Sequence, residues 1–502
     1  MQLKTREMKT LNVLIIAAFS LVLYSCGYEQ SSITGWNYND PKNGGFRKPP
    51  FEEQETGPNL VLIEGGTFTM GRVEQDVMYN WDNVPRRVTV SSFYMDETEI
   101  TNFHWLEYLY WLNRVFGLDY PEVVKKALPD TLVWRSKLAY NEPYVEYYLR
   151  HPAYRDYPVV GVDWLQANDF CTWRTDRVNE YILIREGVLE HYVNQIGEDN
   201  FNTDSYLVGY YESGKRIEGV PDFNPNGTGY RRVKMEDGIL LPKFRLPTEA
   251  EWEYSAYGLI GNSLGERVIE RRLWPWNGHA LRNPEEAYIG EMLANFKRGR
   301  GDNMGIAGKL NDNADVTNPV YAYWPNDYGL YNMAGNVSEW VMDVYRPLSL
   351  EDNEDFRPFR GNVFTTLQYD EEGFLMEKDS LGRLQKRDVT EEENIGRRNY
   401  QRADNKNFLD GDFESHIDNT HWADDFTGEE NKPESKYMYV YADKSLINDN
   451  VRVYKGGSWK DRAYWMNPGT RRFLEEDLET AWIGFRCAMD RVGSPVGLGG
   501  RR

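Results

Sequence analysis

Cysteine and histidine are the residue types in this chain best suited to metal binding and nucleophilic chemistry. Their spacing does not match the common motifs for metal sites or catalytic nucleophiles. The six histidines are His104, His151, His191, His279, His416 and His421. None of them forms a His-Glu-x-x-His pattern or another spacing typical of a metal site. No glycine-rich phosphate loop and no Ser-His-Asp order stands out either. The common catalytic motifs are therefore not found.

The most distinctive stretch runs from Lys455 to Cys487. It opens with Lys-Gly-Gly-Ser-Trp at 455–459 and closes with Gly-Phe-Arg-Cys at 484–487. The glycine pair is typical of backbone that packs too closely for a Cβ or that needs a positive φ. An ordinary glycine turn beside a buried edge strand is the simpler interpretation of each residue taken alone.

The N-terminus has the pattern of a bacterial lipoprotein signal. Basic residues precede an apolar run from Leu11 to Leu23, which is too short for a comfortable membrane span. A small residue and a cysteine follow, so we expect residues 1–25 to be a signal peptide and Cys26 to carry lipid. Each buried CH₂ of an acyl chain contributes about 0.8 kcal/mol, so several acyl chains on Cys26 would hold the protein firmly at a bilayer. A plain secretory signal is the alternative.

Residues 26–59 are rich in Gly, Pro, Ser, Asn and Glu and show no periodic apolar pattern. We expect this lipidated N-terminus to be a flexible tether, and residues 491–502 to be a flexible tail.

Two cysteines remain once Cys26 is set aside. Export would place Cys171 and Cys487 in an oxidising compartment, where a pair of thiols is usually a disulfide. We therefore predict a Cys171–Cys487 disulfide, and removing such a bridge typically costs about 2–5 kcal/mol. Two free buried cysteines are the alternative.

Composition limits the classes of partner. The chain has 502 residues, of which 40% are hydrophobic and 14% aromatic, so it can bury a sizeable core. Its length alone would allow two or three domains. A formal net charge of −21 argues against nucleic acid, because no clustered Lys/Arg stripe accompanies it. An acidic surface suits a divalent cation or a basic protein, although most such surfaces are only solvated.

Local patterns predict a mixture of strands and helices. Alternation and turn residues predict strands at 60–63, 67–71, 87–95 and 157–164. Apolar residues at helical spacing predict helices over 103–116 and about 165–178. Thr101 and Asn102 are candidate caps for the first of these helices. A third helix is expected after Thr248, with Glu251 completing a capping box.

These pieces, in this order, resemble the formylglycine-generating-enzyme (sulfatase-modifying factor) family. The resemblance is carried by seven motifs, at 65–71, 97–102, 157–173, 245–254, 329–340, 456–459 and 484–487. It implies one α+β domain over 60–490, related to C-type lectin folds and low in regular secondary structure, in place of several domains. Family cysteines matching Cys171 and Cys487 form a disulfide, in agreement with the pair predicted above.

The family's chemistry depends on two residues that this chain lacks. Family enzymes oxidise a substrate cysteine with a copper ion held by two cysteine thiolates that follow the Gly-Gly-Ser motif. The matching positions here are Asp461 and Met466. A cuprous ion prefers thiolates, and a carboxylate with a thioether does not replace them. We therefore expect no copper and no catalysis.

The resemblance also implies calcium sites, since Ca²⁺ takes about 6–8 oxygen ligands. The first would use side-chain oxygens and backbone carbonyls of Asn332, Gly335, Val337 and Glu339. The second would use Asn295, Phe296, Asp312 and Ala314. In the alternative interpretation these residues only cap turns.

Compared with compact family members, the chain carries insertions at about 118–155, 175–243 and 347–450. Loops this long are usually functional or flexible, so we expect partner-binding surfaces. The lipoprotein signal, tether, altered domain and insertions together resemble gliding-motility lipoproteins of the Bacteroidota. That resemblance implies an outer-membrane lipoprotein on the periplasmic face, acting as a scaffold for type IX secretion and gliding components, including the GldK–GldN ring.

Two other functions stay open. A calcium-dependent glycan-binding protein would suit a lectin-like fold with exposed aromatic residues. An active copper-dependent oxidase is opposed by Asp461 and Met466.

Overall fold

The computed structural model describes residues 28–50, 52–72, 82–214, 219–258, 263–264, 267–268, 272–299, 314–346, 356–390, 392–393, 447 and 449–493. The chain divides into two compact units. The smaller unit draws on Met1–Glu53, Tyr181–Tyr192 and Gly214–Leu240, and the larger unit on Gln54–Glu180, Val193–Ser213 and Leu241–Arg502. The predicted boundaries of the signal, tether, domain and tail stay predictions.

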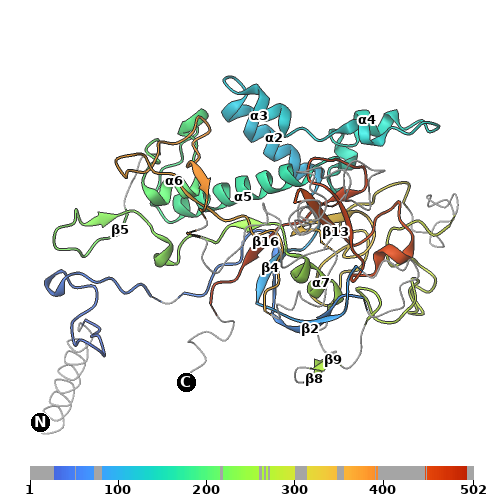
Figure 1. Cartoon of the computed structure of the whole chain (residues 1–502), viewed down its shortest axis with the longest axis horizontal. Helices are drawn as coiled ribbons and strands as arrows, with labels where there is room; N and C mark the ends of the chain where they lie inside the picture. Colours follow the sequence, from blue (N-terminus) through green and yellow to red (C-terminus); the bar gives the residue numbers. More distant parts are fainter. Residues whose placement is uncertain are drawn as a thin grey trace, which may run out of the picture. The chain divides into compact units, whose positions relative to one another are not determined.

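The larger unit contains two four-stranded sheets. The first has the order β1-β4-β16-β7, from β1 (Leu60–Ile63), β4 (Phe93–Asp96), β16 (Ala488–Asp490) and β7 (Phe244–Arg245). Its neighbours are antiparallel, and Ala488 pairs with Met95, so the two ends of the domain lie side by side (Figure 1). The second has the order β14-β13-β10-β15, from β14 (Arg472–Glu475), β13 (Val451–Lys455), β10 (Ser338–Val344) and β15 (Ile483–Gly484). Only the β10–β15 pair is parallel.

A hairpin and a short helix complete the core beside these sheets. The hairpin consists of β2 (Gly66–Met70) and β3 (Arg86–Val90), and the helix is α7 (Glu249–Tyr257). A buried cluster draws on the hairpin, on α7 and on strands of both sheets, and its members include Phe68, Val88, Met95, Trp252, Met333, Val341, Val453 and Ala488. The mixed helix and strand content agrees with the predicted α+β class.

Further helices come from the segments between these strands. They are α2 (Asn102–Phe116), α3 (Pro121–Lys126), α4 (Glu142–Tyr147), α5 (Trp164–Arg185) and α6 (Thr203–Val208), with 3-10 turns η3 (Thr131–Trp134), η4 (Pro152–Tyr154), η5 (Gly197–Asp199) and η11 (Ala463–Met466). Helix α2 packs on α5 through aromatic rings, with the centroids of Trp105 and Phe170 stacked 5.4 Å apart. A short hairpin of β11 (Thr365–Leu367) and β12 (Lys386–Asp388) lies in the third insertion. Backbone alone defines β8 (Ser263–Leu264) and β9 (Arg267–Val268).

Both predicted helix caps are confirmed. Thr248 Oγ1 accepts a hydrogen bond from the Glu251 amide at 3.2 Å, and Glu251 Oε2 accepts one from the Thr248 amide at 2.9 Å. Thr101 caps α2 in the same reciprocal way with His104. Each cap satisfies amides that the first helical turn leaves without a partner.

Two predicted strands were wrong. The run 87–95 breaks at Ser91 and Ser92, so that β3 pairs with β2 while β4 enters the first sheet. The run 157–164 makes only an isolated bridge, between Thr101 and Pro158. Proline has no amide hydrogen to donate to a ladder, which explains why no regular strand forms there.

The smaller unit is built from short pieces. It contains η2 (Pro41–Asn43), η6 (Met235–Asp237), β5 (Val220–Pro221) and β6 (Tyr230–Arg231). Asp237 forms ion pairs with Arg231 at 2.7 Å and with Arg47 at 3.0 Å. Arg47, which lies in the predicted tether, is therefore held by a polar contact within this unit.

Candidate functional site

The turn after β13 leads to Asp461 and Met466, the two positions that the sequence resemblance matched to copper-binding cysteines. Gly456 and Gly457 have φ values of +95° and +69°. A Cβ on Gly456 would stand 3.0 Å from the Trp252 ring, and one on Gly457 would stand 3.0 Å from the Trp465 carbonyl. Both reasons for a glycine pair that the sequence suggested are present.

Asp461 is held in an ion pair. Arg472 donates from Nη1 to Asp461 Oδ1 at 2.7 Å and from Nη2 to Oδ2 at 2.6 Å. Ser458 Oγ donates to the same Oδ2 at 2.6 Å. The Arg472 guanidinium also lies over the rings of Tyr454 and Trp465. Bidentate pairs of this kind are strong and directional, so the carboxylate is already engaged.

Met466 is part of the apolar core. It is fully buried at the end of η11 and belongs to a cluster with Trp274, Met292, Ala294, Phe296 and Ala334. A thioether in such a cluster fills space between other side chains. Neither this thioether nor the Asp461 carboxylate fits a site for a cuprous ion, which prefers thiolates.

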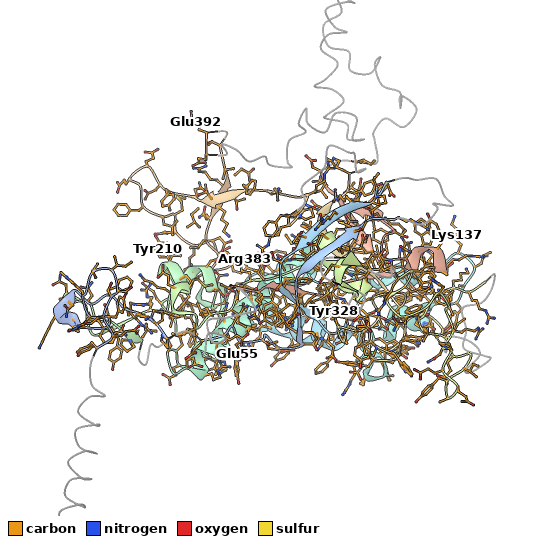
Figure 2. All side chains as sticks on the ribbon, turned by 90° about the horizontal axis from the view of Figure 1, so that it is seen from below. Glu55, Lys137, Tyr210, Tyr328, Arg383 and Glu392 are labelled. Atoms are coloured by element: carbon orange, nitrogen blue, oxygen red, sulfur yellow. The ribbon has the colours of Figure 1, made fainter. Side chains whose placement is uncertain are left out.

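The first insertion packs against this region, which the sequence did not indicate. Trp134, at the end of η3, stacks on Trp459 with ring centroids 6.1 Å apart. Trp459 lies two positions before Asp461 and donates from its indole nitrogen to the Ala481 carbonyl at 3.0 Å. Lys137, in the same insertion, is exposed at the periphery of the larger unit (Figure 2). The only sequence signal was the density of aromatic residues between 118 and 155.

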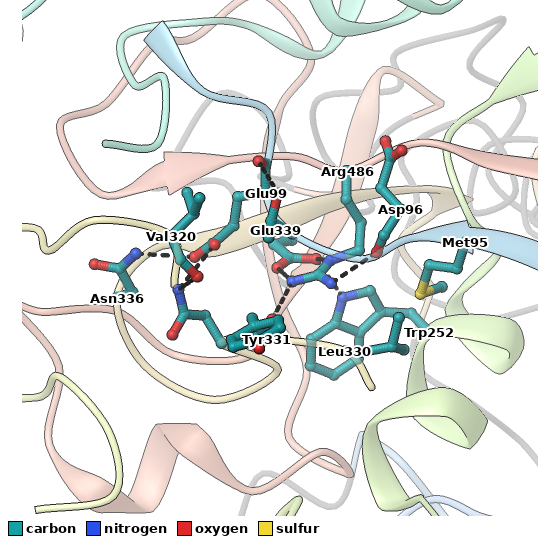
Figure 3. A network of polar contacts seen from close by, with 12 residues as sticks. Met95, Asp96, Glu99, Trp252, Val320, Leu330, Tyr331, Asn336, Glu339 and Arg486 are labelled. Atoms are coloured by element: carbon teal, nitrogen blue, oxygen red, sulfur yellow. Dashed lines mark hydrogen bonds and ion pairs between the residues drawn. The ribbon is translucent and has the colours of Figure 1, made fainter. Parts of the chain in front are cut away.

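Glu339, of the first predicted calcium site, lies in a buried polar network (Figure 3). Both oxygens of Glu339 are occupied by Arg486, through Nη2 to Oε1 at 2.6 Å and Nε to Oε2 at 2.7 Å. The Trp252 indole nitrogen donates to the same Oε2 at 2.7 Å. Arg486 and Glu339 are fully buried, so the guanidinium already neutralises this carboxylate.

The other three residues of that set have structural contacts of their own. Asn332 Nδ2 donates to Glu99 Oε2 at 2.9 Å and to the Val320 carbonyl at 3.0 Å. Gly335 has φ +80°, and a Cβ there would stand 2.3 Å from the Asn295 carbonyl oxygen. Val337 is buried in an apolar cluster. Glu339 is poorly suited as a calcium ligand because Arg486 already neutralises its charge. Calcium binding at this site stays a prediction.

The second predicted calcium set is only partly described. Asn295 Nδ2 donates to the Val316 carbonyl at 2.8 Å, and the Asn295 carbonyl accepts from the Asn336 amide at 2.9 Å. Phe296 and Ala314 are buried, and Asp312 lies outside the described residues. Among the residues that the structure describes, no group of three or more His, Cys, Asp or Glu side chains could hold a metal ion.

The two predicted disulfide partners lie side by side. Cys171, on α5, and Cys487, just before β16, are buried with their sulfurs 3.4 Å apart, as free thiols. A disulfide bond is about 2.05 Å long, so bonding requires a further approach. Burial and the hydrogen bond to Cys171 raise the pKa of the Cys487 thiol. The disulfide stays a prediction that an intact mass measured without reductant would test.

The predicted lipid attachment at Cys26 lies outside the described residues. Within the described part of the chain, no helix combines the length and the apolar character needed to cross a membrane.

Glu99 is the most perturbed carboxyl of the network in Figure 3. It is fully buried and accepts hydrogen bonds from Asn332 at 2.9 Å and from Asn336 at 3.0 Å. Burial, opposed by the charge of Arg486 and assisted by that of Glu339, raises the pKa of Glu99 to about 8. The side chain therefore holds a proton at neutral pH, and sequence reasoning had treated it only as part of a motif.

We expect Glu99→Gln to flatten the pH dependence of stability. An unfolded glutamate titrates near a pKa of about 4.3, so from there to about 8 the folded state binds the additional proton. Glu99 therefore makes the free energy of unfolding fall as the pH rises through this window. The variant should gain stability relative to the parent between about pH 5 and pH 8, measured as the difference in Tm. Glu107→Gln, on the exposed face of α2, is the control, and parallel curves for Glu99→Gln and its parent would contradict the assignment.

A second buried polar network surrounds Lys455, the residue before the Gly456–Gly457 turn. Lys455, the last residue of β13, donates from Nζ to Glu253 Oε2 at 3.0 Å and to Glu249 Oε1 at 3.2 Å. Arg471 donates to the same Glu249 oxygen at 2.7 Å. The Gly71 amide donates to Glu253 Oε1 at 2.6 Å. The sequence showed these glutamates only as residues of an expected helix, and their spacing of one helical turn was the only available signal.

Comparisons with known proteins identify the family of the chain. The profile of the sulfatase-modifying factor enzyme 1-like domain matches residues 45–491. The formylglycine-generating enzyme of Mus musculus is 26% identical over 307 residues, covering 57% of this chain and 58% of that enzyme. The inactive C-alpha-formylglycine-generating enzyme 2 of Bos taurus is 24% identical over 320 residues, covering 60% of this chain and 75% of that protein.

A solved structure, PvdO from Pseudomonas aeruginosa, aligns with a TM-score of 0.40 at 15% identity, covering 88% of this chain and 100% of that one. The matches span less than two thirds of the first curated relatives, 58% of the mouse enzyme and 66% of the formylglycine-generating enzyme of Bos taurus. Since the family profile covers most of its length, the chain belongs to the sulfatase-modifying factor enzyme 1-like (formylglycine-generating-enzyme-like) domain family.

Proposed function

We propose that this protein is a non-catalytic outer-membrane lipoprotein that acts as a scaffold in the type IX secretion and gliding-motility machinery. In this proposal it is of the same kind as the gliding-motility lipoprotein GldJ, with the paralogue GldK as the alternative. Its partners would be components of that apparatus, including the GldK–GldN ring, and the outer membrane would be reached through lipid on Cys26.

The non-catalytic part of the proposal rests on the surroundings of Asp461 and Met466, the positions that match the family's copper-binding cysteines. Asp461 is in a bidentate pair with Arg472, and Met466 is buried in an apolar cluster. Removing either side chain would disturb the fold, so both positions have structural uses. A relative named as an inactive formylglycine-generating enzyme supports the idea that members of this family exist without the activity.

The scaffold part is supported by the size of the insertions. The first insertion packs through Trp134 onto Trp459, so it is joined firmly to the domain core. The third insertion is anchored where it is described, since the Arg360 amide donates to Asp343 and Asn200 donates to the Leu381 carbonyl. Anchored insertions offer added surface on a rigid body, as a scaffold requires.

The full-length protein, extracted from outer membranes with detergent, tests the proposal by affinity purification and mass spectrometry. We expect the GldK and GldN components to be enriched relative to a tagged, unrelated outer-membrane lipoprotein. Deleting residues 394–446 spares the anchored part of the third insertion and should reduce that enrichment while leaving the thermal transition in place. Recovery of the protein without these components, at native expression, would contradict the scaffold function.

A further inference from the structure

Two segments from distant parts of the chain meet beside Asp461. The Lys297 amide donates to the Asp461 carbonyl at 2.8 Å, which places Lys297 next to 460–462. Three cationic residues lie at this contact: Lys297 is half-buried, and Lys460 and Arg462 are exposed. We call these three residues the basic patch.

Asp461 does not cancel the charge of the basic patch. Asp461 gives both carboxylate oxygens to Arg472. Among the described residues, Lys297, Lys460 and Arg462 form no ion pair with an acid. Burial lowers the pKa of Lys460. The nearby charge of Asp461 opposes this shift, and the positive charges of Lys297 and Arg472 lower the pKa further. The patch is therefore positive on a chain whose formal net charge is −21.

Aromatic side chains border the basic patch. Lys460 Nζ lies 3.6 Å from the centroid of the Trp482 ring. Trp459 and Trp482 are both half-buried and belong to the cluster around Trp134. Tryptophan and arginine are enriched in protein–protein interfaces, whereas binding to anionic membranes or nucleic acid relies on more extended runs of cations.

We infer that the basic patch docks an acidic polypeptide segment of a partner protein, beside the positions where relatives hold copper. This inference deepens the proposed scaffold function and depends on it. The negative charge of the rest of the surface repels an acidic segment, while the patch attracts it, so the two together select one face for docking. The overall charge alone had suggested the opposite, a basic partner, because a net value does not show where charges of one sign gather.

A fluorescein-labelled deca-glutamate peptide tests the inference by fluorescence anisotropy on the detergent-solubilised full-length protein. We expect binding that weakens steeply with salt, and a loss of at least about tenfold in affinity in Lys297→Glu/Arg462→Glu. Neither side chain caps a helix or stacks on Trp482. The matched control is Lys125→Glu/Lys126→Glu, which changes the charge equally at two exposed lysines of α3 and should leave binding within about twofold. Thermal melts verify that each variant is folded.

Three results would overturn the inference. The first is no peptide binding by the parent protein at low salt. The second is equal loss in the patch variant and the α3 control, which would indicate attraction without a defined site. The third is patch-dependent binding of phosphatidylglycerol vesicles in place of the peptide, which would assign the patch to a lipid surface. None of these results bears on the purification of GldK and GldN, so the scaffold function is tested separately.

Discussion

Replacing Arg486 with methionine is expected to lower the free energy of unfolding by about 3–5 kcal/mol, measured by chemical denaturation. The substitution keeps much of the side-chain volume but leaves the Glu339 carboxylate buried without its cation, next to Glu99. The guanidinium also bonds the backbone carbonyls of Asp96 and Tyr331, which would lose those donors.

The control is Arg462→Met, at an exposed arginine, which should change stability by no more than about 0.5 kcal/mol. Adding Glu339→Gln to Arg486→Met should recover part of the loss, because the unpaired charge is then removed. A loss under about 1 kcal/mol in the single variant would mean that this pair does not organise the core.

Lys455→Met is expected to have a comparable cost, about 3–5 kcal/mol, for a related reason. It leaves Glu253 fully buried with the Gly71 amide as its remaining partner among the described residues, while Glu249 keeps Arg471. Lys125→Met on α3 is the matched control, with an expected change within about 0.5 kcal/mol. A double variant with Glu253→Gln should be more stable than Lys455→Met alone, and the opposite order would refute the pairing.

Features that depend on neighbours in the chain were the most predictable from sequence. The caps at Thr101 and Thr248 need only residues three positions apart, so their pattern is visible in a short window. The turn at Gly456–Gly457 was expected for the same reason. The break at Ser91–Ser92 was missed because alternation continues across it, and only the pairing partners of β3 and β4 reveal that they belong to different sheets.

The buried networks could not have been predicted in this way. Asn332 and Glu99 are 233 positions apart, and Lys455 and Glu253 are 202 apart, so their contacts arise only when the sheets and α7 are assembled. The same limit applies to the copper positions. The sequence identified Asp461 and Met466 as these positions. Only the fold shows that Asp461 pairs with Arg472 and that Met466 lies in an apolar cluster.

Assay of thiol oxidation tests the central claim most directly. The purified protein would be loaded with Cu(I) and incubated in air with a cysteine-containing peptide of the kind that formylglycine-generating enzymes accept, beside the mouse enzyme as a positive control. Mass spectrometry of the peptide would follow the conversion of cysteine to formylglycine. The structure, with Asp461 paired to Arg472 and Met466 in the core, predicts no conversion above the copper-only background. Copper-dependent conversion above that background would contradict the account.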